Sequence, residues 1–222
     1  MITTTMKRLY IYFVAALSVI LTSCDAHHDY IDTSVKPGHI LLTTGQTVSA
    51  RDYLNGGGTP IAVVFYINQN TEGEKEGTGY AVYLHDIEEK SFTDSIGIKM
   101  NTSADITAYD GNTNTYSMYA TGFSPAADAV YDLWRYGQSA YIPSVAQLRL
   151  LYAVKETINP YIELCGGDPL PYSADECWYW SSTEVEDQET YKSWLYSMGS
   201  GAIQETPKEQ KHKIRPIVTL NN

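Results

Sequence analysis

The side chains best suited to covalent chemistry lie in two short runs. His85 is followed by Asp86, and Ser181 is followed by Ser182. A hydrolase of the Ser-His-Asp type uses these residue types, and many such enzymes expose the serine on a Gly-x-Ser-x-Gly turn. Neither serine stands between glycines at those positions. The sequence therefore predicts no catalytic residue and favours a protein that is not an enzyme.

Residues able to bind a metal ion are present but are poorly arranged for it. Asp110 opens the stretch Asp-Gly-Asn-Thr-Asn, which begins like a calcium loop, yet Thr115 replaces the glycine of the sharp turn and Thr121 replaces the bidentate glutamate. His27 and His28 are neighbours with no further ligands nearby, and no CxxC pair or Cys/His cluster occurs. We therefore expect a plain turn at Asp110, no metal site and no cofactor.

Aromatic and acidic residues gather in two stretches that are expected to be loops. Tyrosine rings carry a hydrogen-bonding tip, and carboxylates accept hydrogen bonds, so such residues can hold a glycan or a protein surface without covalent chemistry. The alternative is a solvated acidic loop with no ligand. The predicted ligand-binding residues are Tyr172, Asp175, Glu186, Asp187 and Tyr191.

Composition limits the class of partner. The chain has 222 residues, enough for one main domain, and 26 acidic against 15 basic residues give a net charge of −11. That charge disfavours a sequence-independent grip on nucleic acid and adsorption to anionic lipid through a basic patch. The 19 tyrosines and four tryptophans indicate an aromatic surface rich in hydrogen-bonding groups.

The N-terminus has the pattern of an export signal. Lys7 and Arg8 precede an uncharged run from Leu9 to Leu21, which is shorter than the ~20 residues of a membrane-spanning helix. The ending Leu-Thr-Ser-Cys resembles the bacterial lipobox, in which the cysteine, here Cys24, is diacylated and becomes the new N-terminus. The alternative is an ordinary secretory peptide with an incidental cysteine. We expect a signal peptide over residues 1–23, a tether over 24–37 and a single domain over 38–222.

The two remaining cysteines are expected to meet. Once Cys24 carries lipid, Cys165 and Cys177 are left in an oxidising compartment, where disulfides persist. The segment between them contains two glycines and two prolines, so it can turn back on itself. The sequence predicts a Cys165–Cys177 disulfide, with two separately buried thiols as the alternative.

Six segments have the apolar character of β-strands. The run over residues 61–67 is apolar throughout, which predicts a central strand covered on both faces, and the segment 80–84 alternates and is expected to expose one face. Residues 91–100 and 106–118 are expected to be loops with short extended pieces. Lys208, Lys211 and Lys213 indicate a solvated hairpin tip. The predicted strands cover residues 39–42, 61–67, 80–84, 177–183, 194–198 and 214–218.

Two helices are marked by capping residues. Ser124 followed by Pro125 predicts a helix start, and an apolar stripe continues to Trp134. Ser144 and Gln147 form a capping-box pattern, and apolar residues recur at helical spacing until Asn159-Pro160 ends the run. Strands and helices together predict an α+β fold.

The C-terminal half resembles a known family. The pattern spans roughly residues 120–222, and its pieces follow in a fairly specific order: Tyr141–Leu148, Trp180–Glu184, Trp194, Gly199 with Gly201, and Ile214–Val218. It resembles the lipoprotein domain called the Fibrobacter major paralogous domain and is similar to the C-terminal domain of the Legionella collagen-like adhesin. The resemblance implies a C-type-lectin-like fold with two main helices and a mostly antiparallel sheet, preceded by a β-rich leader.

The resemblance also implies structural roles for the motif residues. Trp180 is expected in the core with Trp194 packed nearby, and the remaining motif residues are Ser181, Ser182, Arg215 and Pro216. The Glu-Pro-Asn calcium signature of true C-type lectins is missing, so calcium-dependent lectin activity is not expected. Neither is the copper-site cysteine pair of the related formylglycine-generating enzymes present.

The N-terminal export signal and the family resemblance together imply a function at the cell surface. Acidic residues after the lipidated cysteine resemble the signals of Bacteroidetes-type lipoproteins that reach the outer face of the outer membrane. We expect a lipid-anchored binding or adhesin-like protein that meets a glycan or a host or surface protein through its C-terminal loops. The alternatives are an accessory subunit of a fimbria or nutrient-uptake complex and, less favoured, an enzyme related to the formylglycine-generating enzymes.

Overall fold

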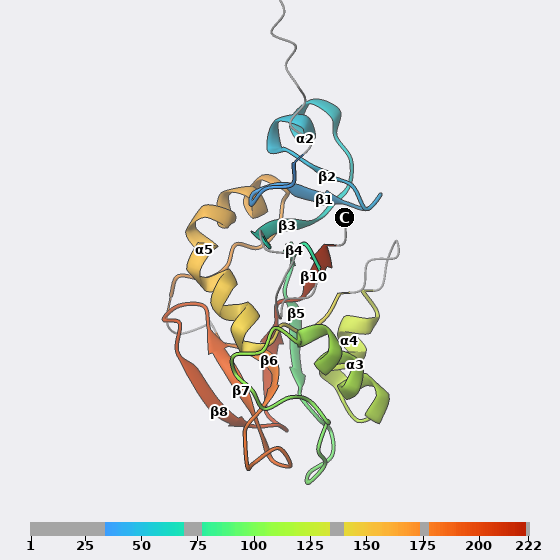
Figure 1. Cartoon of the computed structure of the whole chain (residues 1–222), viewed down its shortest axis with the longest axis vertical. Coiled ribbons are helices and arrows are strands. Elements are labelled where there is room, and N and C mark those ends of the chain that lie inside the picture. The colour runs from blue at the N-terminus through green and yellow to red at the C-terminus, as the bar shows by residue number, and fades with distance from the viewer. Residues whose placement is uncertain (1–33, 69–76, 134–139, 174–177, 221–222) are drawn as a thin grey trace, which may run out of the picture. The chain divides into compact units, whose positions relative to one another are not determined.

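A computed structural model describes residues 34–68, 77–133, 140–173 and 178–220. Val35–Asn222 belong to one compact unit. The described residues form two mostly antiparallel five-stranded sheets and four helices (Figure 1), which confirms the predicted α+β class. None of these helices has the length and apolar character needed to cross a bilayer.

The first sheet is built from both ends of the compact unit. Its strand order is β10-β4-β3-β1-β2, and every neighbouring pair is antiparallel. β3 is the middle strand, as its continuous apolar run predicts, and β10 closes the sheet beside β4. β4 is buried on both faces, so the prediction that this strand exposes one face is wrong. The strands are β1 (Ile40–Leu42), β2 (Thr47–Val48), β3 (Pro60–Ile67), β4 (Gly79–Tyr83) and β10 (Ile217–Leu220).

The second sheet has the order β5-β9-β6-β7-β8, in which β9 runs parallel to β6 and the other pairs are antiparallel. β8 and β9 therefore lie on opposite sides of the β6–β7 pair, and residues 208–210 between them cross the sheet. The prediction that Lys208, Lys211 and Lys213 mark a hairpin tip is therefore wrong. The strands are β5 (Ile87–Ser91), β6 (Trp178–Glu184), β7 (Lys192–Ser197), β8 (Ile203–Pro207) and β9 (Lys211–Ile214).

The long helix α5 (Val145–Leu164) packs against strands of both sheets. Its capping box forms as predicted: the Ser144 hydroxyl accepts from the backbone of Gln147, whose side chain accepts from the backbone of Ser144. The helix continues past Pro160, where the sequence predicted its end. The first core is the cluster of buried apolar residues between α5 and strands of both sheets. Ile162, in the turn after the proline, is fully buried in this core, so tertiary packing outweighs the lost backbone hydrogen bond.

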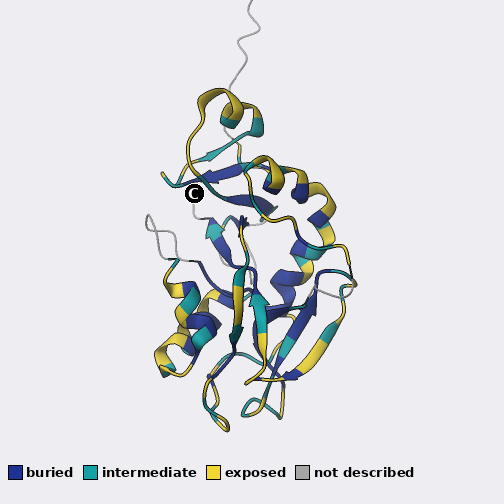
Figure 2. Ribbon diagram, turned by 180° about the vertical axis from the view of Figure 1, so that it is seen from behind, coloured by how far each residue is buried: buried dark blue, intermediate teal, exposed yellow. Residues whose placement is uncertain are grey.

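A second core lies between the second sheet and the shorter helices α3 (Gly111–Thr121) and α4 (Pro125–Tyr131). α4 begins with Ser124 as its cap and Pro125 at its first position, as predicted. The outer surfaces of both helices are exposed and their inner residues are buried (Figure 2). The remaining helix, α2 (Ala50–Gly56), buries no residue and was not predicted.

α3 corrects the expectation of a loop over residues 106–118. Its sequence has no amphipathic pattern, but Met118 is fully buried in the second core. The Thr115 hydroxyl donates to the carbonyl of Gly111 and accepts from the backbone of Ile142, which fixes the helix to the strand-like segment before α5. Gly122, at φ +71°, ends the helix in the left-handed conformation. Long-range contacts rather than helical periodicity create this element.

Candidate functional site

Three connections meet at one end of the second sheet, at the bottom of Figure 1. They are the loop after β5 (residues 92–110), the loop between β6 and β7 (185–191) and the residues after β8 (208–210). Glu184 ends β6, and Lys208 follows β8. Contacts between these two side chains tie the three connections together.

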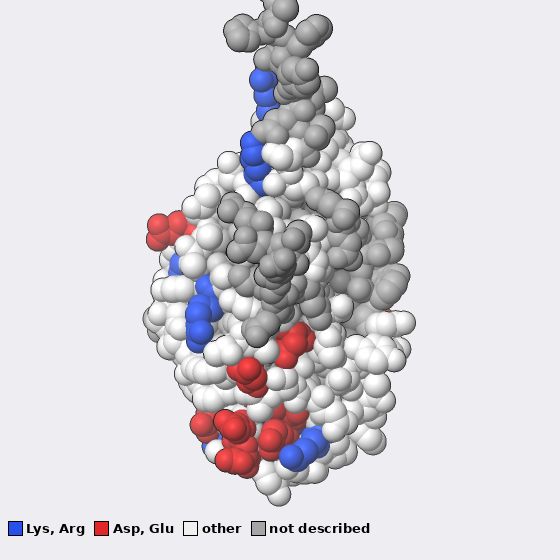
Figure 3. Space-filling model, viewed as in Figure 1, with Lys and Arg blue, Asp and Glu red and all other residues white. Residues whose placement is uncertain are grey.

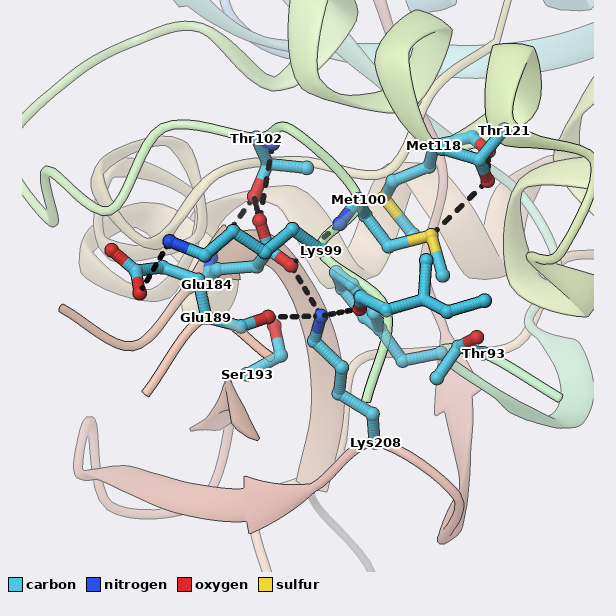
Figure 4. A network of polar contacts seen from close by, with 12 residues as sticks. Thr93, Lys99, Met100, Thr102, Met118, Thr121, Glu184, Glu189, Ser193 and Lys208 are labelled. Atoms are coloured by element: carbon cyan, nitrogen blue, oxygen red, sulfur yellow. Dashed lines mark hydrogen bonds and ion pairs between the residues drawn. The ribbon is translucent and has the colours of Figure 1, made fainter. Parts of the chain in front are cut away.

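Glu184 and Lys208 form a buried ion pair (Figure 4). The exposed fractions of the two side chains are 1% and 0%. The carboxylate of Glu184 also accepts from the backbone N–H of Met100 at 2.9 Å and from the backbone N–H and hydroxyl of Thr102 at 3.1 and 3.0 Å. The acid therefore holds the loop after β5 against the end of β6.

Lys208 is the other half of this junction. Its ammonium donates to the carbonyl of Ile98 at 3.1 Å and to the carbonyl of Glu189, and it lies 5.4 Å from the centre of the Phe92 ring. Burial lowers the pKa of Lys208, and the neighbouring Glu184 carboxylate opposes that shift. The expectation that Lys208 is solvated is wrong. Closely spaced lysines in a sequence do not show which of them turns inward.

A pocket of about 440 Å³ opens beside this junction. That volume lies within the range of ligand sites in proteins, roughly 300–1,000 Å³. One aromatic side chain and three carboxylates dominate the lining, which comprises Trp194, Asp105, Glu186, Glu205, Ala104, Ile106 and Val185.

The pocket has a negative electrostatic character. Its lining contains no basic residue among the described positions, although Lys192 approaches Glu205 at 2.9 Å from outside the lining. Hydrogen bonds from the hydroxyl and backbone N–H of Thr107 lower the pKa of Asp105, so that carboxylate stays ionised. Acidic side chains are concentrated at this end of the face seen in Figure 3. Ligands that carry hydrogen-bond donors or positive charge suit such a site.

The structure places the predicted ligand-binding residues in different surroundings. Glu186 lines the pocket, while Asp187 and Tyr191 lie in the same loop. Tyr172, 58% exposed, lies instead beside α5, with the Lys155 ammonium 5.2 Å from its ring centre. Asp175 lies outside the described residues. The structure therefore associates one predicted residue directly with the pocket and attaches Tyr172 to a different element.

Three pocket residues were not predicted as ligand contacts. Asp105 and Glu205 are far from Glu186 in sequence, and nothing in their local pattern indicates that they meet it. Trp194 was expected to pack near Trp180, but it contacts the first core whereas Trp180 lies in the second, and it is only partly buried and lines the pocket. Its place on β7, next to a loop rich in acids, is the signal that could have identified it.

The motif residues on β6 have mainly buried positions. Trp180 is fully buried against Phe92 and donates from Nε1 to the carbonyl of Lys90 at 2.8 Å. The preceding residue, Tyr179, points to the other core, so both faces of β6 are covered. Ser181 and Ser182 are fully buried as well, and the Ser181 hydroxyl donates to the carbonyl of Trp194.

Arg215 and Pro216 connect the two sheets, between β9 and β10. The guanidinium of Arg215, fully buried, donates to Asp86 at 2.7 Å and to the carbonyl of Asp168. Asp86 also accepts from the hydroxyl of Tyr179. The His85 ring hydrogen-bonds to the Asp168 carboxylate rather than to either serine. His85, Asp86 and Ser181 are therefore held in other contacts, and Ser182 is fully buried.

The cysteines and metal ligands add no further site. Cys165 ends α5, and burial raises the pKa of its thiol to about 11. Cys177 and Cys24 lie outside the described residues, so the disulfide and the lipidation stay predictions. Within the described parts of the chain, no group of three His, Cys, Asp or Glu is placed to hold a metal ion.

Comparison of the whole chain with protein-family models gives no match, and comparison with curated proteins gives none either. The functional argument therefore depends on the residues of this chain.

Proposed function

We propose that this protein is a lipid-anchored, adhesin-like binding protein of the bacterial outer surface that holds a glycan or protein ligand through its C-terminal loops. The observation that carries the proposal is the pocket in which Trp194 lies with Asp105, Glu186 and Glu205. It lies at the end of the second sheet, where loops are free to vary without disturbing the strands that support them.

The pocket chemistry supports recognition of a hydroxyl-rich or amine-bearing group. Ionised carboxylates only accept hydrogen bonds, and sugar hydroxyls and protein ammonium groups donate them. An indole ring adds a flat apolar contact for a sugar face or for a cation. The negative lining disfavours ligands that carry carboxylate or sulfate groups. The ligand of this pocket is therefore neutral or positively charged.

The fold is the second support. The order of motifs over residues 120–222 resembles the Fibrobacter major paralogous domain, and we propose a C-type-lectin-like arrangement for the second sheet and α5. In such an arrangement the strands and the helix supply the frame, and the loops supply the ligand contacts. The fully buried Ser181 and Ser182 are out of reach of a substrate, which supports binding rather than hydrolysis.

The proposed location depends on the N-terminal segment. A signal peptide over residues 1–23 and diacylation of Cys24 would attach the protein to the outer membrane, with the predicted tether over residues 24–37. Attachment through lipid suits a strongly acidic protein, because acidic surfaces are not drawn to anionic lipid.

Binding of the full-length protein, purified in detergent, to an array of glycans and matrix proteins tests the proposal. We expect at least one specific neutral or amine-bearing ligand whose binding does not need calcium. Replacement of two pocket acids, Glu186→Gln with Glu205→Gln, should weaken that binding at least tenfold, because both acceptors lose their charge.

The matched control removes the same charge elsewhere. Glu88 and Glu89 are exposed on β5, outside the pocket lining, so Glu88→Gln with Glu89→Gln should bind as the wild type does. An array without a hit, or equal binding by the pocket variant, would contradict the proposal. Recovery of a stoichiometric protein partner after mild crosslinking of native membranes would instead favour the accessory-subunit alternative.

A further inference from the structure

A second exposed feature lies on the helix pair α3 and α4, on residues separate from those that line the Trp194 pocket. Three tyrosines surround a notch of about 70 Å³ between the helices. Their exposed fractions are 73% for Tyr116, 37% for Tyr119 and 48% for Tyr131. Exposed aromatic side chains in a group are uncommon on soluble domains and mark binding surfaces.

Two of these rings form a rigid stacked pair. Tyr119 and Tyr131 are stacked with their centroids 4.1 Å apart and their planes inclined by 13°. Each ring restricts the other before any ligand arrives, so little side-chain entropy remains to be lost on binding. The arrangement is therefore already organised for a flat partner.

The floor beneath the notch is also fixed. Tyr141 is fully buried, and its hydroxyl lies 2.8 Å from that of Thr219. The hydroxyl of Thr115 is held between Gly111 and Ile142. Because these inner polar groups are already bonded, a ligand would meet the outer ring faces and the exposed amide of Asn112.

The surface over α3 is uncharged in a protein whose net charge is −11. No residue of α3 is charged at neutral pH, and its exposed side chains are those of Asn112, Thr113, Tyr116, Tyr119 and Ala120. In Figure 3 the area over α3 shows neither acid nor base colour. The exposed acids Asp128, on α4, and Asp132, at its C-terminal cap, lie near Tyr131, and the described residues of α3 and α4 include no base, so a neutral ligand suits this surface better than an anionic one.

The small notch indicates a polymer rather than a small molecule. At about 70 Å³ it is far below the roughly 300–1,000 Å³ of sites that enclose a ligand. Only a part of the ligand, such as one substituent, can enter it, while the rest lies across the tyrosines. An extended chain of sugar rings has flat apolar faces for the aromatic rings and hydroxyls for the phenols and the amide.

We propose that the tyrosine platform, defined as Tyr116, Tyr119 and Tyr131, is a second binding site that takes an uncharged polysaccharide. It differs from the Trp194 pocket in both position and charge, so the two sites can be tested separately on one protein.

The test is affinity electrophoresis of the full-length protein in native detergent gels that contain dextran, amylopectin, xyloglucan or galactomannan. We expect at least one of these polymers to retard the wild type. The double variant Tyr116→Ala with Tyr119→Ala should lose at least tenfold in affinity for that polymer. Tyr119→Phe keeps the stacked ring and should retain most of the affinity.

Two controls separate this site from misfolding and from the pocket. Leu54→Ala removes an exposed apolar side chain of α2, 67% exposed, and should bind as the wild type does. Retardation that is lost in Glu186→Gln with Glu205→Gln but kept in the tyrosine double variant would show that the polymer binds in the Trp194 pocket and would overturn the proposal, and all variants should share one circular dichroism spectrum. Absence of retardation by all four polymers, unchanged affinity of the double variant, or blockage of the platform by a crosslinked protein partner would each overturn the proposal.

Discussion

The Glu184–Lys208 pair shows how single residues determine the shape of a loop region in this protein. Both side chains are buried, and together they contact the backbone of two connections, while Lys208 itself belongs to the third. The pair's attraction is offset by the cost of removing two charges from water, so its role is best described as specifying the loop arrangement. Since Glu186 follows two residues later, this junction also positions the pocket.

Removing one partner of this pair should be costly. Glu184→Gln leaves the buried Lys208 ammonium without its counter-charge, and we expect the free energy of unfolding to fall by about 3–5 kcal/mol. Urea denaturation followed by circular dichroism measures the change.

The comparison for this experiment is an exposed pair. Lys99 and Glu189 lie 3.2 Å apart, with exposed fractions of 57% and 26%. Lys99→Met should cost no more than about 1 kcal/mol, as exposed ion pairs do. A similarly small loss for Glu184→Gln would show that the buried contact does not hold in solution.

At this scale the sequence predicted some positions and missed others for a physical reason. Trp180 could be assigned to the core because a tryptophan on an apolar strand is usually largely buried. Lys208 could not, because its burial depends on a partner 24 residues away in the chain. Glu186 could be chosen from its loop, whereas Asp105 and Glu205 join it only through the folding of distant segments.

At the scale of elements, β1, β3, β4, β6 and β7 and the starts of α4 and α5 were predicted. The predicted strand 214–218 is wrong, because β9 ends at Ile214 and β10 begins at Ile217 in the other sheet, and β2, β5, β8, α2 and α3 were not predicted. The capping box of α5 and the serine cap of α4 are local signals that the structure confirms. α3 has no such signal, since its stability comes from Met118 in the second core and from contacts with the segment before α5. Its terminating glycine, Gly122, was the one local clue.

Gly111 tests this tertiary origin of α3. A Cβ atom at this position would lie 2.3 Å from Oε1 of Gln147 and 2.7 Å from the carbonyl oxygen of Ile142. Gly111→Ala should therefore displace the capping box of α5 as well as α3, with a loss of about 1–3 kcal/mol in unfolding free energy.

The matched control for Gly111 is a glycine with room around it. A Cβ atom at Gly56, the last residue of α2, would lie in open space, with nothing packed against it within 4 Å. Gly56→Ala should leave stability unchanged or slightly raised, because alanine favours the helix. Thermal unfolding of both variants decides the matter, and equal melting temperatures would contradict the close packing at Gly111.

At the scale of the whole molecule, the two sheets should unfold together. β10 belongs to the first sheet but follows β9 of the second sheet after two residues, and α5 packs on both. Destabilising the first sheet should therefore also destabilise the second. Small single units of this kind usually unfold in one cooperative step.

Val218→Ala in β10 examines this coupling. Val218 is 2% exposed and packs in an apolar cluster formed by strands of the first sheet, whereas three of the four tryptophans, Trp178, Trp180 and Trp194, lie on the second sheet and report on it. We expect the tryptophan fluorescence midpoint in urea to fall together with the circular dichroism midpoint. An unchanged fluorescence midpoint with a lowered circular dichroism midpoint would show that the sheets unfold separately.

The position of β10 also bears on how the protein is made. A ribosome produces β3 and β4 well before β10, the strand that pairs with the free edge of β4. Until then a nascent chain carries an apolar, unpaired strand edge, the kind of surface that chaperones cover and that pairs wrongly with other chains. The first sheet can reach its final form only after β10 has left the ribosome.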